Sequence, residues 1–255
     1  MSVWIDVLRS ERVQVLRIMR PERKNALTGA MYRALSDALE AGEANAEIAT
    51  HVIFGSNGIF SAGNDVADFL ATAQGEAGLG PDVLRFIRML PVLEKPLLAG
   101  VDGPAVGVGT TLLLHCDLVY ASPAAIFSTP FLDLGLVPEA ASSLLMPRAM
   151  GHVRAFEMLA LGEPFSAERA LQSGLINGIV PADRLEDVVI AAAVRLANKP
   201  PEALRLARRL LKGDPDVIRA RMDEEAAMFA ERLRSPEAVA AFQAFLGKRG
   251  QRTES

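Results

Sequence analysis

The chain has 255 residues, 50% of them hydrophobic, which is enough to bury a sizeable core in one domain with at most a small appendage. Its formal net charge is −4, from 27 basic and 31 acidic residues, so it lacks the overall positive charge of a general binder of nucleic acid or anionic membrane. An anionic ligand must therefore be held by a local basic cluster.

The cysteine, histidine and apolar residues indicate whether disulfides, metal sites or membrane spans are to be expected. Cys116 is the only cysteine, so no internal disulfide can form, which fits a reducing compartment. The histidines are scattered without metal-ligand spacing, so no metal site is expected. The longest apolar stretch, Pro96 to Leu114, contains Asp102 and Pro104, which a bilayer-spanning helix would not tolerate well. The N-terminus also lacks the apolar block of a signal peptide, and we expect a soluble, cytoplasmic protein without a membrane span.

Apolar runs and periodic spacing predict alternating strands and helices in the first half of the chain. The expected order is two hairpin strands over 3–8 and 13–19, a helix N-capped by Thr28, a strand over 51–54, a helix over 83–93, a strand over 97–101, a helix over 110–115 and a strand over 118–121. The stretch from 71 to 80 is rich in Gly, Ala and Gln and predicts a mobile loop.

From Ala140 onward the pattern becomes almost wholly helical. Helical periodicity fits residues 153–161, 167–173, 185–197, 202–211, 217–233 and 237–246. Strand–helix alternation followed by helices predicts an α/β fold. We divide it into a core over residues 1–197 and a helical C-terminal region over residues 198–255.

The segment Phe60-Ser61-Ala62-Gly63-Asn64-Asp65 is the first candidate for chemistry. Its small residues precede an expected helix start, where Asn64 or Asp65 would cap. A helix start presents unpaired backbone N–H groups, which can hold a polarised carbonyl oxygen. The alternative is an ordinary loop capped by an aspartate, and this segment alone favours that interpretation.

The segment from Asp102 to Thr111 is the second candidate, because its glycines let the backbone approach a ligand closely. Leu112 stands where a dinucleotide fingerprint needs a third glycine, and no Gly-Lys-Ser/Thr follows for a phosphate loop. Two interpretations stay open: backbone N–H groups offered to a ligand, or close packing of a helix on a strand.

The segment from Val137 to Ser143 is the third candidate, because Glu139 lies beside small residues at an expected helix start. The carboxylate can complement the helix dipole, or it can be a base whose pKa is raised in an apolar pocket. Ser142 and Ser143 lack the Gly-x-Ser-x-Gly turn and a nearby histidine, which argues against a serine nucleophile.

Seven short pieces carry a family resemblance when they are read in order: Arg20 to Leu27, Phe60 to Asp65, Gly103 to Gly109, Cys116 to Leu118, Phe127 to Pro130, Leu134 to Pro138 and Ala170 to Ile176. Together they resemble the enoyl-CoA hydratase/isomerase (crotonase) family over nearly the whole chain. Each piece alone is weak, whereas the ordered set is specific.

The resemblance implies an α/β spiral of strand–strand–helix units and a C-terminal helical region that supports trimerisation. It also implies an oxyanion hole for the thioester oxygen, built from the backbone N–H groups of Asn64 and Val108. The family usually carries glycine at the position of Val108. Because the donor is the backbone N–H, which valine also has, we expect the oxyanion hole to be retained with less space around it.

Departures from the family pattern narrow the expected reaction. Hydratases of the family use two glutamates, and the corresponding positions here hold Thr111 and Phe131. An acid appears instead at Glu139, an arrangement that looks like the peroxisomal type of Δ3,Δ2-enoyl-CoA isomerase. The resemblance therefore implies Glu139 as the single catalytic base, in a dry pocket lined by Phe131 and Leu136, and a place in fatty acid β-oxidation.

The resemblance also implies which residues contact the acyl-CoA: Arg23, Lys24, Ala26, Leu27, Ser61, Ala62, Gly63, Asp65, Val66, Gly107, Phe131 and Leu136. Lys248 and Arg249 are possible contacts to the CoA phosphates, with a solvated basic surface as the alternative. CoA is part of the substrate, so no separate cofactor is expected, and the implied assembly is a homotrimer or a dimer of trimers.

Two other functions remain open. The first is another thioester reaction of the same family, such as hydration, hydrolysis or dehalogenation. The second is a non-catalytic acyl-CoA-binding or scaffolding relative, against which the Ala62-Gly63 element and Glu139 argue.

Overall fold

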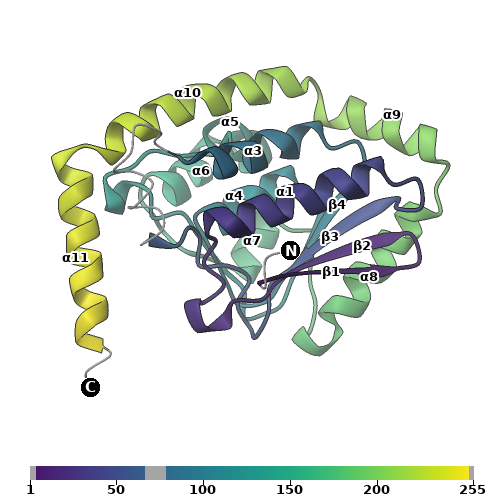
Figure 1. Ribbon diagram of the computed structural model, residues 1–255, viewed down its shortest axis with the longest axis horizontal. Helices are drawn as coiled ribbons and strands as arrows, with labels where there is room; N and C mark the ends of the chain where they lie inside the picture. The colour runs from purple at the N-terminus through teal and green to yellow at the C-terminus, as the bar shows by residue number, and fades with distance from the viewer. Residues whose placement is uncertain (1–3, 67–78, 253–255) are drawn as a thin grey trace.

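The computed structural model describes residues 4–66 and 79–252 (Figure 1), so most of the loop expected at 71–80 lies outside the described residues. The strands are β1 Ile5–Ser10, β2 Val13–Ile18, β3 Thr50–Phe54, β4 Leu97–Val101, β5 Pro104–Val106, β6 Leu118–Ala121, β7 Ile126–Ser128, β8 Phe165–Ser166 and β9 Gly178–Ile179. The α-helices are α1 Gly29–Ala44, α3 Pro81–Met89, α4 Val108–Thr111, α5 Ser142–Met150, α6 His152–Leu159, α7 Ala167–Ser173, α8 Ala182–Ala197, α9 Pro201–Lys212, α10 Pro215–Leu233 and α11 Pro236–Arg252. The 3-10 turns are η1 Pro21–Arg23, η2 Leu90–Val92, η3 Leu112–His115 and η4 Leu132–Leu134.

A six-stranded sheet with the order β1-β2-β3-β4-β6-β9 forms the centre of the molecule. The first two strands form the expected antiparallel hairpin, in which Ile5 lies opposite Ile18 and Ser10 lies opposite Val13. Every later pairing in this sheet is parallel. β3 and β4 are buried along their whole length, as is usual for parallel strands covered on both faces.

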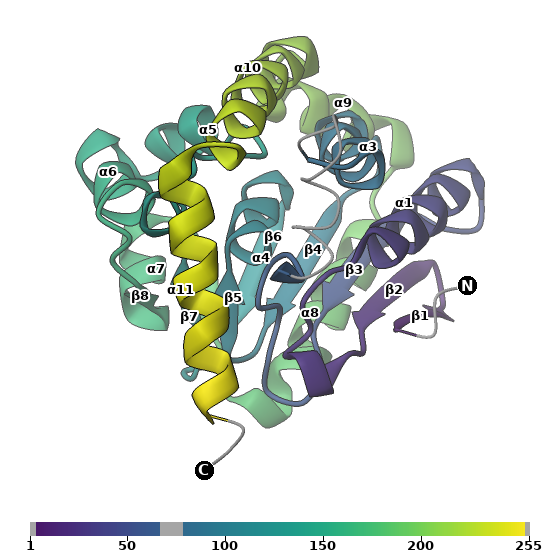
Figure 2. The ribbon, with the colours of Figure 1, turned by 60° about the vertical axis from the view of Figure 1, so that its left-hand side comes forward.

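Alternate strand residues face two separate helical layers. Val13, Val15, Val52, Phe54 and Leu98 share one apolar cluster with Leu185, Val189 and Ala193 of α8. The intervening strand residues, Leu16, Ile18, Ile53, Leu97 and Ala99, belong to the main core with α1 and α3. This period of two is the geometry of a pleated strand, and Figures 1 and 2 show α1 and α8 on opposite faces of the sheet.

A smaller sheet with the order β5-β7-β8 completes a spiral. Each of β4 and β6, in the large sheet, is followed in sequence by a short strand, β5 or β7, in the small one. An isolated parallel bridge between Ser61 and Ala105 ties the segment after β3 to this second layer. The expected spiral of strand–strand–helix units is therefore confirmed.

The C-terminal helices α9, α10 and α11 follow one another along the top and left of Figure 1, which confirms the helical C-terminal region. α10 packs inward through Met222 and Phe229, which are buried. α11 packs against the turn after η4, where a Cβ at Gly135 would lie 2.8 Å from the backbone N of Ala238. The division at residue 197 itself stays a prediction.

Two expected helices differ from their predicted form. The helix expected over 83–93 is α-helical only to Met89, because Pro91 removes a backbone N–H and continues the chain as a 3-10 turn. The helix expected over 110–115 begins earlier, at Val108, and tightens into a 3-10 turn from Leu112. In the described part of the chain, no helix combines the length and the apolar character needed to cross a bilayer.

Candidate active site

The segment from Ser61 to Asp65 runs beside Lys24 to Leu27 like a short parallel strand. The N–H of Leu27 donates to Gly63 O, and the N–H of Asp65 donates to Leu27 O, both at 2.8 Å. Leu27 and Asn64 form the intervening parallel bridge. In such a bridge the partner's own N–H points to the other side of the strand, so the N–H of Asn64 faces away from Leu27.

The second segment begins at Gly107, whose φ of 55° and ψ of −121° are open to glycine alone among the common residues. Val108 is the first residue of α4, and the N–H groups of Thr110 and Thr111 already occupy Gly107 O. The N–H of Val108 belongs to the first helical turn, where it has no acceptor within the helix.

The two segments approach at backbone distance. The N–H of Val106 donates to Ser61 O at 2.9 Å. A Cβ at Gly63 would lie 2.9 Å from Val106 O, and a Cβ at Gly109 would lie 2.9 Å from Ser61 O, so both glycines are needed for this approach. The arrangement can supply two N–H donors, from neighbouring stretches of backbone, to one oxygen atom.

Side chains hold the first segment in place. The Tyr32 hydroxyl donates to Asn64 Oδ1 at 2.5 Å, from the buried face of α1. Arg20 Nη1 lies 2.7 Å from Asp65 Oδ2, so that carboxylate forms an ion pair. Sequence reasoning did not single out Tyr32 or Arg20, because neither interaction has a local spacing that identifies it.

Glu139 is 2% exposed and accepts a hydrogen bond from Thr111 Oγ1 at 2.5 Å. Thr111 lies three residues after Val108 on α4, so the two share a helix face and are separated by roughly 5 Å along the axis. The hydrogen bond therefore joins the Glu139 carboxyl to the same short helix whose first residue is Val108. Phe131 and Leu136, 6% and 4% exposed, belong to the same apolar core as Val108.

Burial raises the pKa of the Glu139 carboxyl to about 7, because a charged carboxylate loses its hydration in this setting. The hydrogen bond from Thr111 opposes that rise, and the nearby carboxyl of Glu225 adds to it. A group with this pKa can accept and return a proton at neutral pH.

The backbone after Glu139 is unusual. Ala140 and Ala141 have φ values of 56° and 57°, so two successive non-glycine residues are left-handed, at a cost of about 1–2 kcal/mol each. α5 begins only at Ser142, and Glu139 therefore precedes the helix start instead of lying at it. The first turn of α5 is occupied by Glu225 of α10, which accepts from the N–H groups of Ala141 and Ser143.

The residues expected to contact CoA divide into exposed and buried groups. Arg23 and Lys24 are exposed at η1, and Lys24 O accepts from the N–H of Ala62 at 3.0 Å, which joins this basic pair to the donor segment. Ala26 and Leu27 are buried, and the backbone of Leu27 pairs with the segment. Val66 and Gly107 are half-buried. Lys248 and Arg249 lie near the end of α11, and their side chains are outside the described residues.

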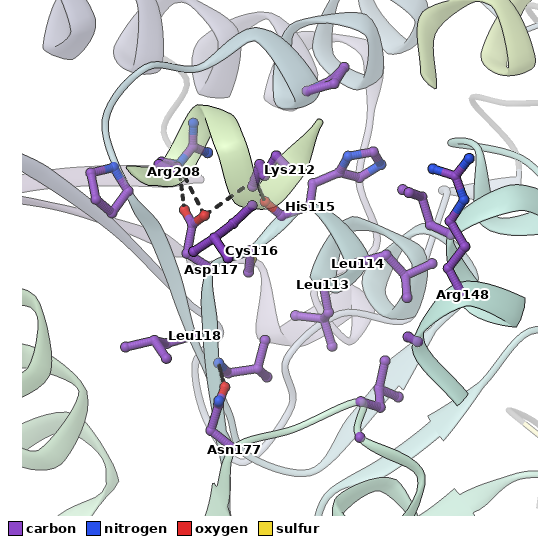
Figure 3. Close-up of a pocket in the computed structure, with 18 of the residues that line it drawn as sticks. Leu113, Leu114, His115, Cys116, Asp117, Leu118, Arg148, Asn177, Arg208 and Lys212 are labelled. Atoms are coloured by element: carbon purple, nitrogen blue, oxygen red, sulfur yellow. Dashed lines mark hydrogen bonds and ion pairs between the residues drawn. The ribbon is translucent and has the colours of Figure 1, made fainter. Parts of the chain in front are cut away.

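A pocket of about 640 Å³ lies elsewhere, around η3 and α9 (Figure 3), and none of the expected site residues lines it. Asp117 accepts from Arg208 Nε at 2.8 Å, and Lys212 lies 3.6 Å from the same carboxylate. Cys116 also lines the pocket, but burial raises the pKa of its thiol to about 12, so it stays protonated and is a poor nucleophile.

Comparison with known proteins decides the family. Residues 9–254 match the family model described as enoyl-CoA hydratase/isomerase. The chain belongs to this family. Its fold agrees with a solved structure of an enoyl-CoA hydratase/isomerase from Pseudoalteromonas atlantica, which is 39% identical, has a TM-score of 0.91, and is matched over 96% of this chain and 97% of that one. The expected crotonase-type fold is thus confirmed.

Similar family members carry out more than one reaction. The rat protein named enoyl-CoA delta isomerase 2 is 36% identical over 90% of this chain, but the chain spans only 60% of that protein's length. The Escherichia coli protein named 2,3-dehydroadipyl-CoA hydratase is 32% identical over 95% of both chains. The family membership therefore fixes the fold and leaves the choice between isomerase and hydratase to the site residues.

Proposed function

We propose that this chain is a Δ3,Δ2-enoyl-CoA isomerase that moves a double bond with one carboxyl group. The observation that carries the proposal is Glu139: a buried carboxyl with a raised pKa, hydrogen-bonded to the helix that begins at Val108. The rat isomerase relative supports the same activity. The proposed substrate is a 3-enoyl-CoA thioester.

The proposed chemistry uses the two backbone donors and the carboxylate together. The N–H groups of Asn64 and Val108 bind the thioester oxygen, and the Glu139 carboxylate removes a proton from carbon 2. The C–H electron pair passes into the thioester, giving a dienolate whose negative oxygen the two donors stabilise. The protonated Glu139 then returns the proton to carbon 4, which leaves a trans-2-enoyl-CoA.

One base suffices because carbons 2 and 4 flank a single carbon, so one carboxyl group can reach both on the same face of the chain. We expect the buried apolar residues Phe131 and Leu136, which belong to the same core as Val108, to help exclude water from the carboxyl. Dry surroundings also favour return of the abstracted proton over its exchange with solvent.

The second candidate reaction is hydration of a 2-enoyl-CoA, which the Escherichia coli relative performs according to its name. Hydration needs a second group to activate and position the water. At the two positions that the family resemblance assigns to hydratase glutamates, this chain has Thr111 and Phe131, and neither can act as a carboxylate base.

Product analysis in deuterated water tests the proposal. Given cis-3-hexenoyl-CoA, the protein should form trans-2-hexenoyl-CoA with less than one deuterium per turnover, because Glu139 carries the proton internally. Glu139→Gln should remove at least 99% of this turnover while the variant stays folded. Faster formation of 3-hydroxyacyl-CoA from a 2-enoyl-CoA than isomerisation of the 3-enoyl substrate would overturn the assignment in favour of hydration.

The proposal includes a homotrimer, or a dimer of trimers, in the cytoplasm, acting in fatty acid β-oxidation. The assembly is supported by apolar side chains on the outer face of α9, where Leu210 and Leu211 are 84% and 88% exposed. An exposed apolar surface of this kind is typical of a contact between chains.

A further inference from the structure

Glu225 is a buried carboxyl group that the proposed reaction does not use. It lies on α10 and is 5% exposed. Its carboxylate accepts from the N–H of Ala141 at 2.6 Å, from the N–H of Ser143 at 3.0 Å and from Ser143 Oγ at 2.5 Å. All three donors belong to the turn that follows Glu139 and the start of α5.

This carboxylate replaces a missing local cap. The residue that precedes α5, Ala141, has no side chain able to accept from the first-turn N–H groups, and the helix has no side-chain cap hydrogen bond of its own. An N-terminus without a cap leaves backbone donors unsatisfied. Here the acceptor comes from a helix more than eighty residues later in the chain, so the turn depends on tertiary contact.

The same turn is held from the other side by an imidazole. His115 Nε2 lies 2.8 Å from Ala140 O. Burial lowers the pKa of His115 to about 4, so the ring is neutral and Nε2–H is the donor. Lys212 Nζ in turn donates to the backbone oxygen of His115. The left-handed pair Ala140–Ala141 is thus fixed between a carboxylate and a neutral imidazole.

We propose that Glu225 is the positioning residue of the site: it clamps the Ala140–Ala141 turn so that Glu139 points toward α4, and its negative charge favours the proton-carrying form of Glu139. The first part follows from the three hydrogen bonds. The second follows because two carboxylates in a desolvated region repel each other. The inference rests on the proposed role of Glu139 as the base.

Four charged or titratable groups in the described part of the chain bear on Glu225 and its turn: Glu139, Arg221, His115 and Lys212. Repulsion from Glu225 contributes to the raised pKa of Glu139. Arg221, one turn earlier on α10, lies 3.5 Å from Ser143 Oγ and acts against the rise in the pKa of Glu225 that burial causes. His115 stays neutral, and Lys212 donates to His115 O and lies 3.6 Å from Asp117. Glu225 is therefore the group whose removal changes the charge felt by Glu139.

The test compares Glu225→Gln with a matched change one residue away, Glu224→Gln. Glu224 is exposed, and its carboxylate meets only the surface side of α10, at Arg221. We expect Glu225→Gln to lower kcat at least tenfold with a much smaller change in KM, since the turn no longer aims Glu139 correctly. We also expect the acid side of the pH profile of kcat to move to lower pH by about one unit. The reason is that the pKa of Glu139 falls when the negative charge of Glu225 is removed. Glu224→Gln should change neither.

An infrared titration separates this inference from the proposed reaction. The band of the protonated Glu139 carboxyl, identified by its absence in Glu139→Gln, should titrate at lower pH in Glu225→Gln than in the unaltered protein. If the band shifts in this way but the unaltered protein has no isomerase activity, the proposed reaction is overturned and the positioning role is kept. An unshifted band and an unchanged kcat in an active enzyme would overturn the positioning role alone.

A milder variant covers the case in which Glu225→Gln does not fold. Ser143→Ala removes one of the three hydrogen bonds and leaves no new buried polar group in its place. We expect a fall of roughly threefold to tenfold in kcat, with KM nearly unchanged. An unaltered kcat in folded Ser143→Ala would contradict the clamp.

Discussion

Burial of the Glu139 carboxyl group affects both the activity and the stability of the protein. Among the described residues, only the hydrogen bond from Thr111 opposes the rise that burial causes in the pKa of Glu139. The result is a residue that destabilises the folded chain when it is ionised and that is ready to exchange a proton at neutral pH. Both consequences can be measured by changing one residue at a time.

The pH dependence of stability should reveal Glu139. Its folded-state pKa, about 7, lies above the ordinary 4.5, so the folded state binds the proton more tightly than the unfolded state. Between pH 4.5 and 7 the free energy of unfolding should therefore fall as pH rises, by about 3 kcal/mol in total from this group. Urea denaturation at pH 5 and pH 8 should show Glu139→Gln gaining stability relative to the unaltered chain at pH 8. An equal difference at both pH values would contradict the raised pKa.

Thr111→Val should act on the same carboxyl in the opposite direction from Glu225→Gln. The substitution keeps the shape and removes the hydroxyl that donates to Glu139 at 2.5 Å. We expect the acid side of the pH profile of kcat/KM to move to higher pH, because the ionised Glu139 carboxylate loses its hydrogen-bond donor. The rate at pH 7 should then fall several-fold. Thr50→Val is the matched control, at a buried hydroxyl on β3 that donates a long hydrogen bond of 3.5 Å to Ala193 O. A profile whose acid side moves to lower pH would refute the role given to Thr111.

At the scale of elements, the proposed oxyanion hole depends on how closely two backbone segments pack. Gly63→Ala puts a Cβ 2.9 Å from Val106 O at a φ of 85°, so the two segments must separate. We expect kcat to fall by about 10²-fold or more, as for loss of one oxyanion donor. Gly213→Ala is the control, since its φ is 75° but a Cβ there meets no atom within 4 Å. Comparable losses of activity in both variants would show that left-handed strain, and not the close approach, is responsible.

Elements whose limits depend on neighbouring residues were predictable from the sequence. α7 and β6 have the expected limits, and Thr28 caps α1 by accepting from the N–H of Met31, because these features depend on neighbouring residues. The short strands β5, β7, β8 and β9, of two or three residues, were not predicted, since so few residues carry no period. The start of α5 was expected at Glu139 but lies at Ser142, because a distant residue caps it, and its end was not predicted because Pro147 interrupts its interior.

The candidate site was predictable only as separate motifs. The glycines around Asn64 and Val108 indicated where backbone could approach a ligand, and Glu139 stood out as an acid among small residues. The hydrogen bond from Thr111 and the clamp by Glu225 join segments 28 and 82 or more residues apart. Such contacts are produced by folding and leave no spacing in the sequence that could reveal them.

At the scale of the molecule, the outer face of α9 should join copies of the chain. Leu210 is 84% exposed, and Leu211 beside it is 88% exposed. Leu210→Glu should reduce the mass measured by light scattering to that of one chain, because a charge is then buried in the contact. Leu8→Glu, at a leucine 51% exposed on β1, is the control and should leave the mass unchanged. An unaltered mass in Leu210→Glu would exclude this face from the assembly.

The packing of α11 on the turn after η4 has a practical consequence for protein engineering. Gly135 touches the backbone of Ala238, and Arg232 Nε donates to Gly135 O at 3.1 Å, so the last helices brace the loop between Phe131 and Leu136. Deleting α11 to shorten the chain should therefore loosen the loop that carries Phe131 and Leu136, the residues proposed to line the pocket of Glu139. Affinity tags and fusion partners should be joined in a way that leaves Ala238 and Phe242 seated.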